Sequence, residues 1–174
     1  MRASLRMTAL VLGPVVLALA ACEPTEEQAI EQTAQRAAQP EPFTPEVRAA
    51  VDSAFHSEQY AENVFLRVLS DHGEQPVFLR WLYGEIQHTS RLASLYLARG
   101  LEAPVSRWNI TNVPSYPTIE AACEAATEIE EGSVELYSRF LDELELPPDV
   151  EQVFRFIRQR SGAHLDSFEQ CAGA

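Results

Sequence analysis

The sequence predicts an all-α domain of four long helices, and the placement of proline is the first reason. From residue 45 onward, proline occurs only at positions 45, 76, 104, 114, 117, 147 and 148. Four long stretches therefore lack it: 46–75, 77–103, 118–146 and 149–174. Because proline is strongly disfavoured inside helices, each stretch has room for a helix of about five turns or more. A β-sandwich or doubly wound fold would show denser turn signals and β-branched alternation, and 174 residues suit one domain.

The charge composition excludes one large class of function. The chain has 26 acidic and 13 basic residues, which is a formal charge of −13, and every basic residue is arginine. The basic residues form no run in the sequence. An acid excess of this size argues against nucleic-acid binding, which needs a positively charged surface.

Residues 1–21 are predicted to be a lipoprotein signal peptide. A short region with two arginines precedes an apolar stretch over residues 7–20, which is too short to span a bilayer comfortably. The region ends in Leu-Ala-Ala-Cys22, which resembles the bacterial lipobox and predicts Cys22 as the lipidated mature N-terminus. An ordinary signal peptide cut nearby is the alternative. Two or three acyl chains on Cys22 are enough for stable membrane anchoring.

The residues after Cys22 predict a tether and a location. Lipoproteins with aspartate after the cysteine are often kept at the inner membrane, so Glu23 favours the outer membrane of a bacterial envelope, facing the periplasm. Residues 22–44 are rich in Glu, Gln, Ala, Thr and Pro, which is typical of a flexible linker. Residues 1–21 contain two arginines and no acid, so the mature chain has a formal charge of −15.

The first two predicted helices form a hairpin. The first covers about residues 45–70, with Thr44 as a suitable N-cap and a stop signal at Gly73. The second covers about residues 76–99 and stops at Gly100. Each begins with proline, which is favoured at the first helical position.

The last two predicted helices form a second hairpin within a domain over residues 45–174. The third helix covers about residues 118–146, and the fourth begins at residue 148 or 149 and runs close to the C-terminus. The crossover between the hairpins, residues 100–117, contains Trp108 and Tyr116, so we expect it to pack against the helices. Two antiparallel hairpins joined by a long crossover is the ferritin-like topology of the four-helix bundle.

Each predicted helix carries an apolar stripe, at steps of three and four, that polar residues interrupt near its middle. The stripes are Val51, Ala54, Glu58, Ala61, Phe65 and Val68; Phe78, Trp81, Glu85, His88, Leu92 and Leu95; Cys123, Ala126, Glu130, Ser133, Tyr137, Phe140 and Leu144; and Val150, Val153, Ile157, Ser161, His164, Phe168 and Cys171. Three carboxylates and two imidazoles therefore fall on inward faces.

These buried acids predict a metal site. An unpaired buried carboxylate costs several kcal/mol, and no arginine lies on the stripes to pair with one. Protonation is an alternative, but a divalent ion supplies the compensating charge with the least strain. Glu85-Ile-Gln-His88 is a Glu-x-x-His pair on one helical face, as used by di-iron carboxylate bundles together with single glutamates from other helices. We expect the ligands to be Glu58, Glu85, His88, Glu130 and His164.

Four segments carry a resemblance to a known family. They are Ser57-Glu58-Gln59-Tyr60-Ala61, Gly84-Glu85-Ile86-Gln87-His88, Ile129-Glu130-Glu131 and Ser161-Gly162-Ala163-His164-Leu165. The chain resembles the ferritin-like superfamily, which includes rubrerythrin, and these segments are similar to a bacterial branch called domain of unknown function 2202. The resemblance covers residues 46–172. It implies the same five metal ligands.

The chain departs from the superfamily at one ligand position. The fourth-helix glutamate is replaced by Ser161, which leaves three carboxylates and makes Ser161 a candidate ligand or water-positioning group. Glu62 or Glu131 would supply a fourth carboxylate after a small helix rotation. With neutral histidines the site carries a charge of about −3, so one divalent ion, or two with an oxo or hydroxo bridge, are both compatible. Oxygen and nitrogen ligands suit iron first, with manganese or zinc as alternatives.

The remaining two cysteines are predicted to form a disulfide. Cys123 lies seven residues before Glu130, and Cys171 lies seven residues after His164. In antiparallel helices both cysteines would lie about 10.5 Å from the ligand level, at the same end. A disulfide is reasonable outside the cytoplasm, and a redox-active pair near the metal is the alternative.

Four residues near the predicted ligands receive structural interpretations. Tyr137 is expected to pack in the core, with a hydrogen bond to a metal ligand as the alternative. Gly84, Gly132 and Gly162 lie inside predicted helices, where each costs about 1 kcal/mol relative to alanine. Close contact with another helix or a local π-bulge would explain them.

These features predict a lipid-anchored, ferritin-like metal-binding protein. If it is an enzyme, an iron-dependent oxidoreductase or ferroxidase-like activity on oxygen or peroxide is expected. The chain has no rubredoxin-like Cys-x-x-Cys electron donor, which weakens a self-contained peroxidase. The alternatives are a non-catalytic metal-buffering lipoprotein and a metal-free helical interaction module. Expected partners are the membrane, metal ions and an unidentified protein or redox partner; a homodimer is compatible, and a storage cage is not expected.

Overall fold

The computed structural model describes residues 40–173. The predicted signal peptide, the predicted lipidation site Cys22 and most of the predicted tether lie outside these residues. The described part of the chain contains four helices and no strand: α2 (Pro45–His72), α3 (Pro76–Leu97), α4 (Ile119–Glu143) and α5 (Pro148–Ala172). The predicted all-α class is confirmed.

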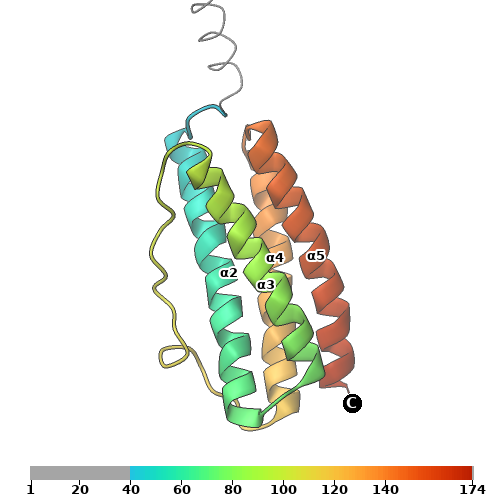
Figure 1. The fold of residues 1–174 in the computed structure, drawn as a ribbon. Coiled ribbons are helices and arrows are strands. Elements are labelled where there is room, and N and C mark those ends of the chain that lie inside the picture. Colours follow the sequence, from blue (N-terminus) through green and yellow to red (C-terminus); the bar gives the residue numbers. More distant parts are fainter. Residues whose placement is uncertain (1–39, 174) are drawn as a thin grey trace, which may run out of the picture. The chain divides into compact units, whose positions relative to one another are not determined.

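The helices form a bundle of two antiparallel hairpins. Residues 73–75 join α2 to α3, and residues 144–147 join α4 to α5. Residues 98–118 cross the length of the bundle, so that α3 and α4 run in the same direction (Figure 1). Besides the contacts within each hairpin, α2 packs against α4 and α3 packs against α5. This is the ferritin-like topology that the helix order predicts.

Threonine side chains cap two of the helices. The Thr44 hydroxyl accepts a hydrogen bond from the Val47 N–H at 3.2 Å, and the Thr118 hydroxyl accepts one from the Ala121 N–H at 3.2 Å. Each bond satisfies a backbone donor that has no partner within its helix. The starts of α2 and α4 are therefore set by local chemistry.

Two helices end earlier than the sequence predicts. α3 ends at Leu97 instead of residue 99, and a turn follows to Gly100, which has a positive φ of 67°. Glycine takes this conformation at little steric cost. α4 ends at Glu143 instead of residue 146, because Leu144 is extended, with φ −115° and ψ 142°. Pro147 follows three residues later, and a proline disfavours the helical conformation of the residue before it.

Two apolar clusters fill the bundle, one toward each end. The first includes Val51, Phe55, Leu92, Tyr96, Phe154 and Ile157. The second includes Val64, Phe65, Phe78, Ala126 and Phe168. Between them lies a layer of buried polar side chains: Glu58, Glu85, His88, Glu130, Ser133, Ser161 and His164. The interruptions of the four apolar stripes therefore meet at one level of the bundle.

The crossover packs against the helices, as its aromatic residues predict. The Trp108 ring contacts the Tyr60 ring edge to face, with centroids 5.0 Å apart. Val113 is buried in the apolar cluster that also contains Phe65. The Arg67 guanidinium donates a hydrogen bond from Nη1 to the Ile110 carbonyl at 3.0 Å. These contacts hold the crossover on the bundle.

A disulfide joins the two helices of the second hairpin. It links Cys123 of α4 to Cys171 of α5, and their Cα atoms are 5.8 Å apart. This is an ordinary separation for a disulfide. Cys123 is fully buried in the apolar cluster at that end of the bundle. The spacing argument from the sequence thus identified the pair that the structure brings together.

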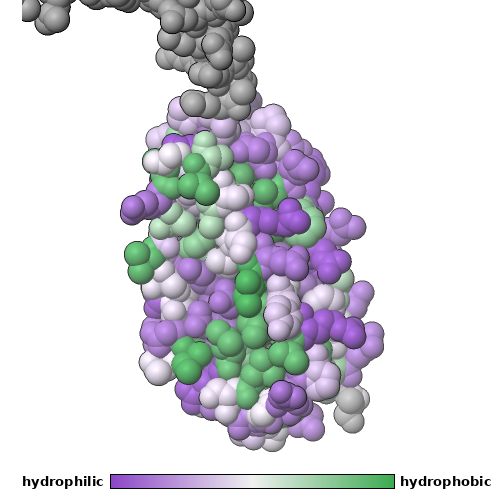
Figure 2. Space-filling model, in the orientation of Figure 1, coloured by the Kyte–Doolittle hydropathy of each residue, from purple (hydrophilic) through white to green (hydrophobic). Residues whose placement is uncertain are grey.

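Polar and apolar residues are mixed on the face that Figure 2 shows, and one group of apolar residues lies toward the end of the bundle where α2 joins α3. Leu79, Tyr83 and Ile86 are large exposed apolar residues of α3. None of the helices in residues 40–173 combines the length and the apolar character that crossing a bilayer requires.

Candidate metal centre

The five predicted ligand residues meet in the polar layer. Glu58 comes from α2, Glu85 and His88 from α3, Glu130 from α4 and His164 from α5. Each residue is at most 1% exposed. Two groups have ligand atoms that all lie within 4.8 Å of one another: Glu58 with Glu85 and His88, and Glu85 with Glu130 and His164. Glu85 belongs to both groups and is therefore the centre of the arrangement.

In the first group, both oxygens of Glu58 have a partner. His88 Nδ1 lies 2.8 Å from Glu58 Oε2 and 3.5 Å from Glu85 Oε2. The Tyr137 hydroxyl donates a hydrogen bond to Glu58 Oε1 at 2.7 Å. The expectation of plain core packing for Tyr137 was therefore incomplete, and the hydrogen bond considered as its alternative is present. α4 packs against α2, and this contact brings the hydroxyl to the carboxylate.

The second group repeats this geometry around the other histidine. His164 Nδ1 lies 2.9 Å from Glu85 Oε1 and 3.1 Å from Glu130 Oε1. The direction of the ring N–H suits Glu130, so the hydrogen bond goes there and Glu85 Oε1 accepts none. The His88 and His164 rings are stacked, with centroids 5.3 Å apart and planes 10° apart. The two groups thus lie on either side of the Glu85 carboxylate, each with one histidine.

Burial and mutual charge determine where protons reside in this layer. Burial raises the pKa of Glu85, and the Glu58 charge raises it further. Burial and the Glu85 charge raise the pKa of Glu130 to about 7. For His88, burial lowers the pKa, but hydrogen bonds to Glu58 and Glu85 outweigh it and raise the pKa to about 10. Without a metal, protons on these groups offset the carboxylate charge, and a metal ion would have to displace them.

Two residues of α3 hold His164 in place. A Cβ atom on Gly84 would lie 2.8 Å from His164 Cε1 and 2.9 Å from Nε2, so the glycine permits the imidazole to approach the helix. The Trp81 ring packs against the His164 ring, with centroids 4.1 Å apart. The sequence pattern placed Trp81 only in the apolar stripe. Trp81 lies one helical turn before Glu85, and this spacing could have indicated that its ring lies beside the ligands.

The three additional candidates differ in position. Glu131 is exposed, so it does not supply a fourth carboxylate. Glu62 is half-buried, accepts a hydrogen bond from Thr89 at 3.5 Å, and belongs to neither ligand group. Ser161 is fully buried in the polar layer, and its hydroxyl has no hydrogen-bond partner among the described residues.

The donor set suits a metal ion. It consists of three carboxylates and two imidazole nitrogens, which is the chemistry of iron, manganese and zinc sites. Glu85 Oε1 and the Ser161 hydroxyl are buried without a hydrogen-bond partner, and buried polar atoms of this kind call for a ligand or ordered water. The layer can therefore hold a metal ion, and its two groups provide for a second.

Comparison with known proteins supports the fold. Neither a family model nor a curated protein matches the sequence. A solved structure of a hypothetical protein from Methanococcus jannaschii is similar with a TM-score of 0.67 and 17% identity, over 76% of this chain and 83% of that one. A conserved hypothetical protein from Mycobacterium tuberculosis is similar with a TM-score of 0.61 and 14% identity, over 73% and 90%. At these identities the likeness shows the fold alone.

Proposed function

We propose that this protein binds two iron ions at neighbouring sites for which Glu85 would be a common ligand residue, inside a helical bundle anchored to a bacterial envelope. The two ligand groups that share Glu85 carry the proposal. Glu58 and His88 would complete one iron site, and Glu130 and His164 the other. All five side chains are buried between two apolar clusters, where uncompensated carboxylates would be strongly unfavourable.

Iron is the first choice among the ions that these donors suit. Manganese or zinc would accept the same oxygen and nitrogen ligands. When bound, iron would supply the one-electron chemistry needed for iron oxidation or for reduction of oxygen or peroxide. The protein's part would be to hold the ions in a buried site and, through the unpartnered Ser161 hydroxyl, to orient a small ligand such as water.

Metal analysis of matched variants tests the proposal. The purified chain loaded with Fe(II) under anaerobic conditions should retain about two ions after desalting, and Glu130→Gln should lose at least one of them. Glu131→Gln is the matched control, because this neighbouring acid is exposed. Glu85→Gln should lose both ions because each group depends on its carboxylate. A chain that binds no metal at neutral pH, with an unchanged melting temperature after chelation, would refute the metal site.

Turnover separates an enzyme from a metal buffer. The iron-loaded protein is mixed with oxygen or hydrogen peroxide and an excess of Fe(II), and consumption is followed. An oxidoreductase should consume oxygen or peroxide over many cycles, and Glu85→Gln should abolish this. Iron that stays bound while neither oxidant is consumed would favour metal buffering instead.

The envelope location is part of the same proposal and rests on residues 1–22 of the sequence. Cys22 would carry the lipid, and residues 22–44 would link it to the helical domain. The branch of the ferritin-like superfamily that the sequence resembles remains the proposed family. Expression in a bacterial host tests the anchor: the protein should sediment with membranes, and Cys22→Ser should release it to the soluble fraction. An unlipidated mature N-terminus in mass spectrometry would contradict this part alone.

A further inference from the structure

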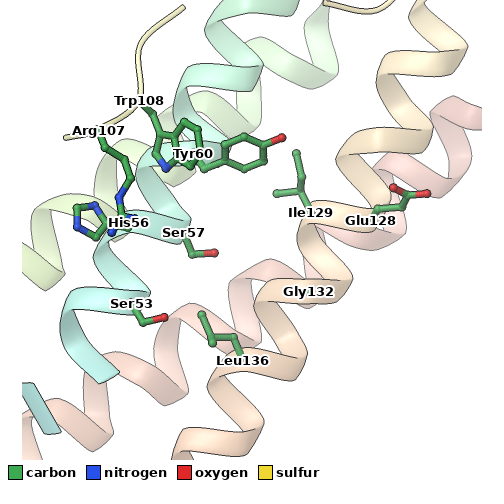
Figure 3. A pocket seen from close by; sticks show the side chains of 10 residues that line it. All are labelled: Ser53, His56, Ser57, Tyr60, Arg107, Trp108, Glu128, Ile129, Gly132 and Leu136. Atoms are coloured by element: carbon green, nitrogen blue, oxygen red, sulfur yellow. The ribbon is translucent and has the colours of Figure 1, made fainter. Parts of the chain in front are cut away.

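A cavity on the side of the bundle lies outside the candidate metal centre. It has a volume of about 470 Å³ and lies between α2, α4 and the crossover (Figure 3). None of the residues that line it is a candidate metal ligand. Its volume is in the range of pockets for small organic molecules, and the proposed metal binding does not use it.

One part of the cavity is apolar and aromatic. Tyr60 of α2 and Trp108 of the crossover form an edge-to-face pair in its wall. Ile129 and Leu136 of α4 line the opposite wall (Figure 3). Walls of this kind suit a planar apolar group, which gains free energy by leaving water and by contact with aromatic rings.

Another part of the cavity carries a cation, the Arg107 side chain, which forms no ion pair with any of residues 40–173. The Arg107 side chain extends toward His56 (Figure 3). Among residues 40–173, Arg107 takes part in hydrogen bonding only through its backbone carbonyl, which accepts from Asn112. Arginine stays charged under all physiological conditions. The Arg107 side chain is exposed at the cavity wall and has no carboxylate partner among the described residues, so its guanidinium can pair with a ligand anion.

The His56 imidazole lies beside Arg107 in the wall of the cavity (Figure 3). His56 Nδ1 is buried and forms no hydrogen bond to any described residue. Burial and the charge of Arg107 lower the pKa of His56 by more than the Gln59 side chain and the charge of Asp52 raise it. The ring is thus biased toward its neutral form, in which one nitrogen donates and the other accepts hydrogen bonds.

Gly132 keeps the floor of the cavity open. It lies in the middle of α4, and a Cβ atom built there would have no neighbour within 4 Å. Glycine inside a helix costs about 1 kcal/mol relative to alanine, and close packing does not require it here. A larger side chain at this position would extend into the cavity that Gly132 lines.

We propose that this cavity binds a small organic acid. Its carboxylate would pair with Arg107, beside the His56 ring, while its planar apolar part would lie against Tyr60 and Trp108. Glu128 lines the cavity across from Arg107 (Figure 3). Its charge repels an anion, so the carboxylate binds at the Arg107 end. The proposal is independent of the metal centre.

Binding of 2-naphthoate, with 2-naphthamide as a neutral control, tests the charge requirement. Titrations of the metal-free full-chain protein are followed by calorimetry and by the indole N–H signal of Trp108 in NMR spectra. Naphthoate should bind saturably and at least about tenfold more tightly than naphthamide, because a charge-assisted pair adds to the same apolar contact. Arg107→Gln should lower naphthoate affinity to that of the amide. Equal affinity for both compounds, or an unchanged affinity in Arg107→Gln, would overturn the proposal.

Glycine variants test the location. Gly132→Leu should abolish naphthoate binding by filling the cavity. Gly162→Leu is the matched control, because this α5 glycine also has no neighbour within 4 Å but does not line the cavity. It should retain the wild-type affinity. Circular dichroism confirms that each variant is folded. If Gly132→Leu folds and still binds naphthoate with wild-type affinity, the cavity is not the site.

Discussion

Gly84 shows how the absence of one carbon atom shapes the candidate metal centre. The His164 ring occupies the space that a Cβ atom would take, so the helix α3 and the imidazole of α5 come into direct contact. Close contact thus explains this glycine. Gly132 and Gly162 have no neighbour within 4 Å of a Cβ atom, and residues 119–172 contain no π-helical turn at either position. Neither of the explanations predicted from the sequence therefore applies to these two glycines.

Gly84→Ala should weaken metal binding. The added methyl group would displace the His164 ring, and displacing a ligand's support typically reduces metal affinity by about 10–100-fold. Gly162→Ala is the control, and it should raise the free energy of unfolding by up to about 1 kcal/mol without changing metal affinity. Isothermal titration with Fe(II) or Zn(II) and urea denaturation provide the two measurements. An unchanged metal affinity in Gly84→Ala would mean that His164 is not a ligand.

Tyr137→Phe should destabilise the metal-free protein. The variant removes the hydrogen bond to Glu58 Oε1 and leaves a buried carboxylate oxygen without a partner, at a cost of about 2 kcal/mol. Tyr83→Phe is a suitable control, because Tyr83 is 63% exposed and should change the free energy of unfolding by less than about 0.5 kcal/mol. Urea denaturation measures both. A similar small effect for the two variants would show that the Tyr137 hydroxyl contributes only packing.

At the scale of elements, an ion pair joins the end of α3 to the start of α5. Arg99, just after α3, donates from Nη1 to Asp149 Oδ2 at 2.8 Å and from Nη2 to Asp149 Oδ1 at 3.0 Å. The same guanidinium donates to the Leu95 carbonyl at 3.0 Å. The Arg99 side chain is 3% exposed, and Asp149 lies in the first turn of α5. This bidentate pair holds α3 and α5 together at one end of the bundle.

The ion pair between Arg99 and Asp149 should make the free energy of unfolding fall at low pH. The hydrogen bond from Arg99 lowers the pKa of Asp149 below the ordinary value of an aspartate, so the stabilisation by the ion pair is present above that ordinary value and is lost as the pH falls through the lower folded-state pKa. Asp149→Asn should reduce the free energy of unfolding at pH 7 by about 1 kcal/mol, a figure that allows for solvent screening of the exposed Asp149 side chain. The difference from wild type should shrink toward zero as the pH falls through the lowered pKa of Asp149.

Urea denaturation across a series of pH values checks this expectation. Asp142→Asn on the exposed face of α4 serves as the control, and it should differ little from wild type at every pH. A destabilisation by Asp149→Asn that persists unchanged at low pH would assign the effect to packing instead of charge.

At the scale of the whole molecule, the two apolar clusters enclose the polar layer from both ends. Their burial provides the main stabilising term, and the layer between them opposes it unless protons or metal ions offset its charge. The disulfide between Cys123 and Cys171 closes a segment of 48 residues at one of these ends. The second hairpin is therefore constrained by a covalent bond close to the second apolar cluster.

Removing the disulfide should lower the free energy of unfolding of the whole bundle. For a closed segment of this length, the chain-entropy model gives about 4 kcal/mol, and measured values are typically about 2–4 kcal/mol. The double variant Cys123→Ser, Cys171→Ser should lose that amount in urea denaturation under oxidising conditions. Two alkylatable thiols in wild-type protein secreted to the periplasm would show that the bond does not form there.

Local patterns in the sequence were enough to predict the four helices, their inward faces, the five buried acids and histidines and the cysteine pair. Proline placement and the period of 3.6 residues per turn are local properties, and residues a fixed number of turns apart reach the same level in antiparallel helices. Only the tertiary structure placed Glu85 in both ligand groups, brought Tyr137 to Glu58 and set His164 against Gly84. It also formed the cavity between α2, α4 and the crossover. These features depend on how the helices rotate and approach one another, which is decided by the packing of side chains from all four helices at once.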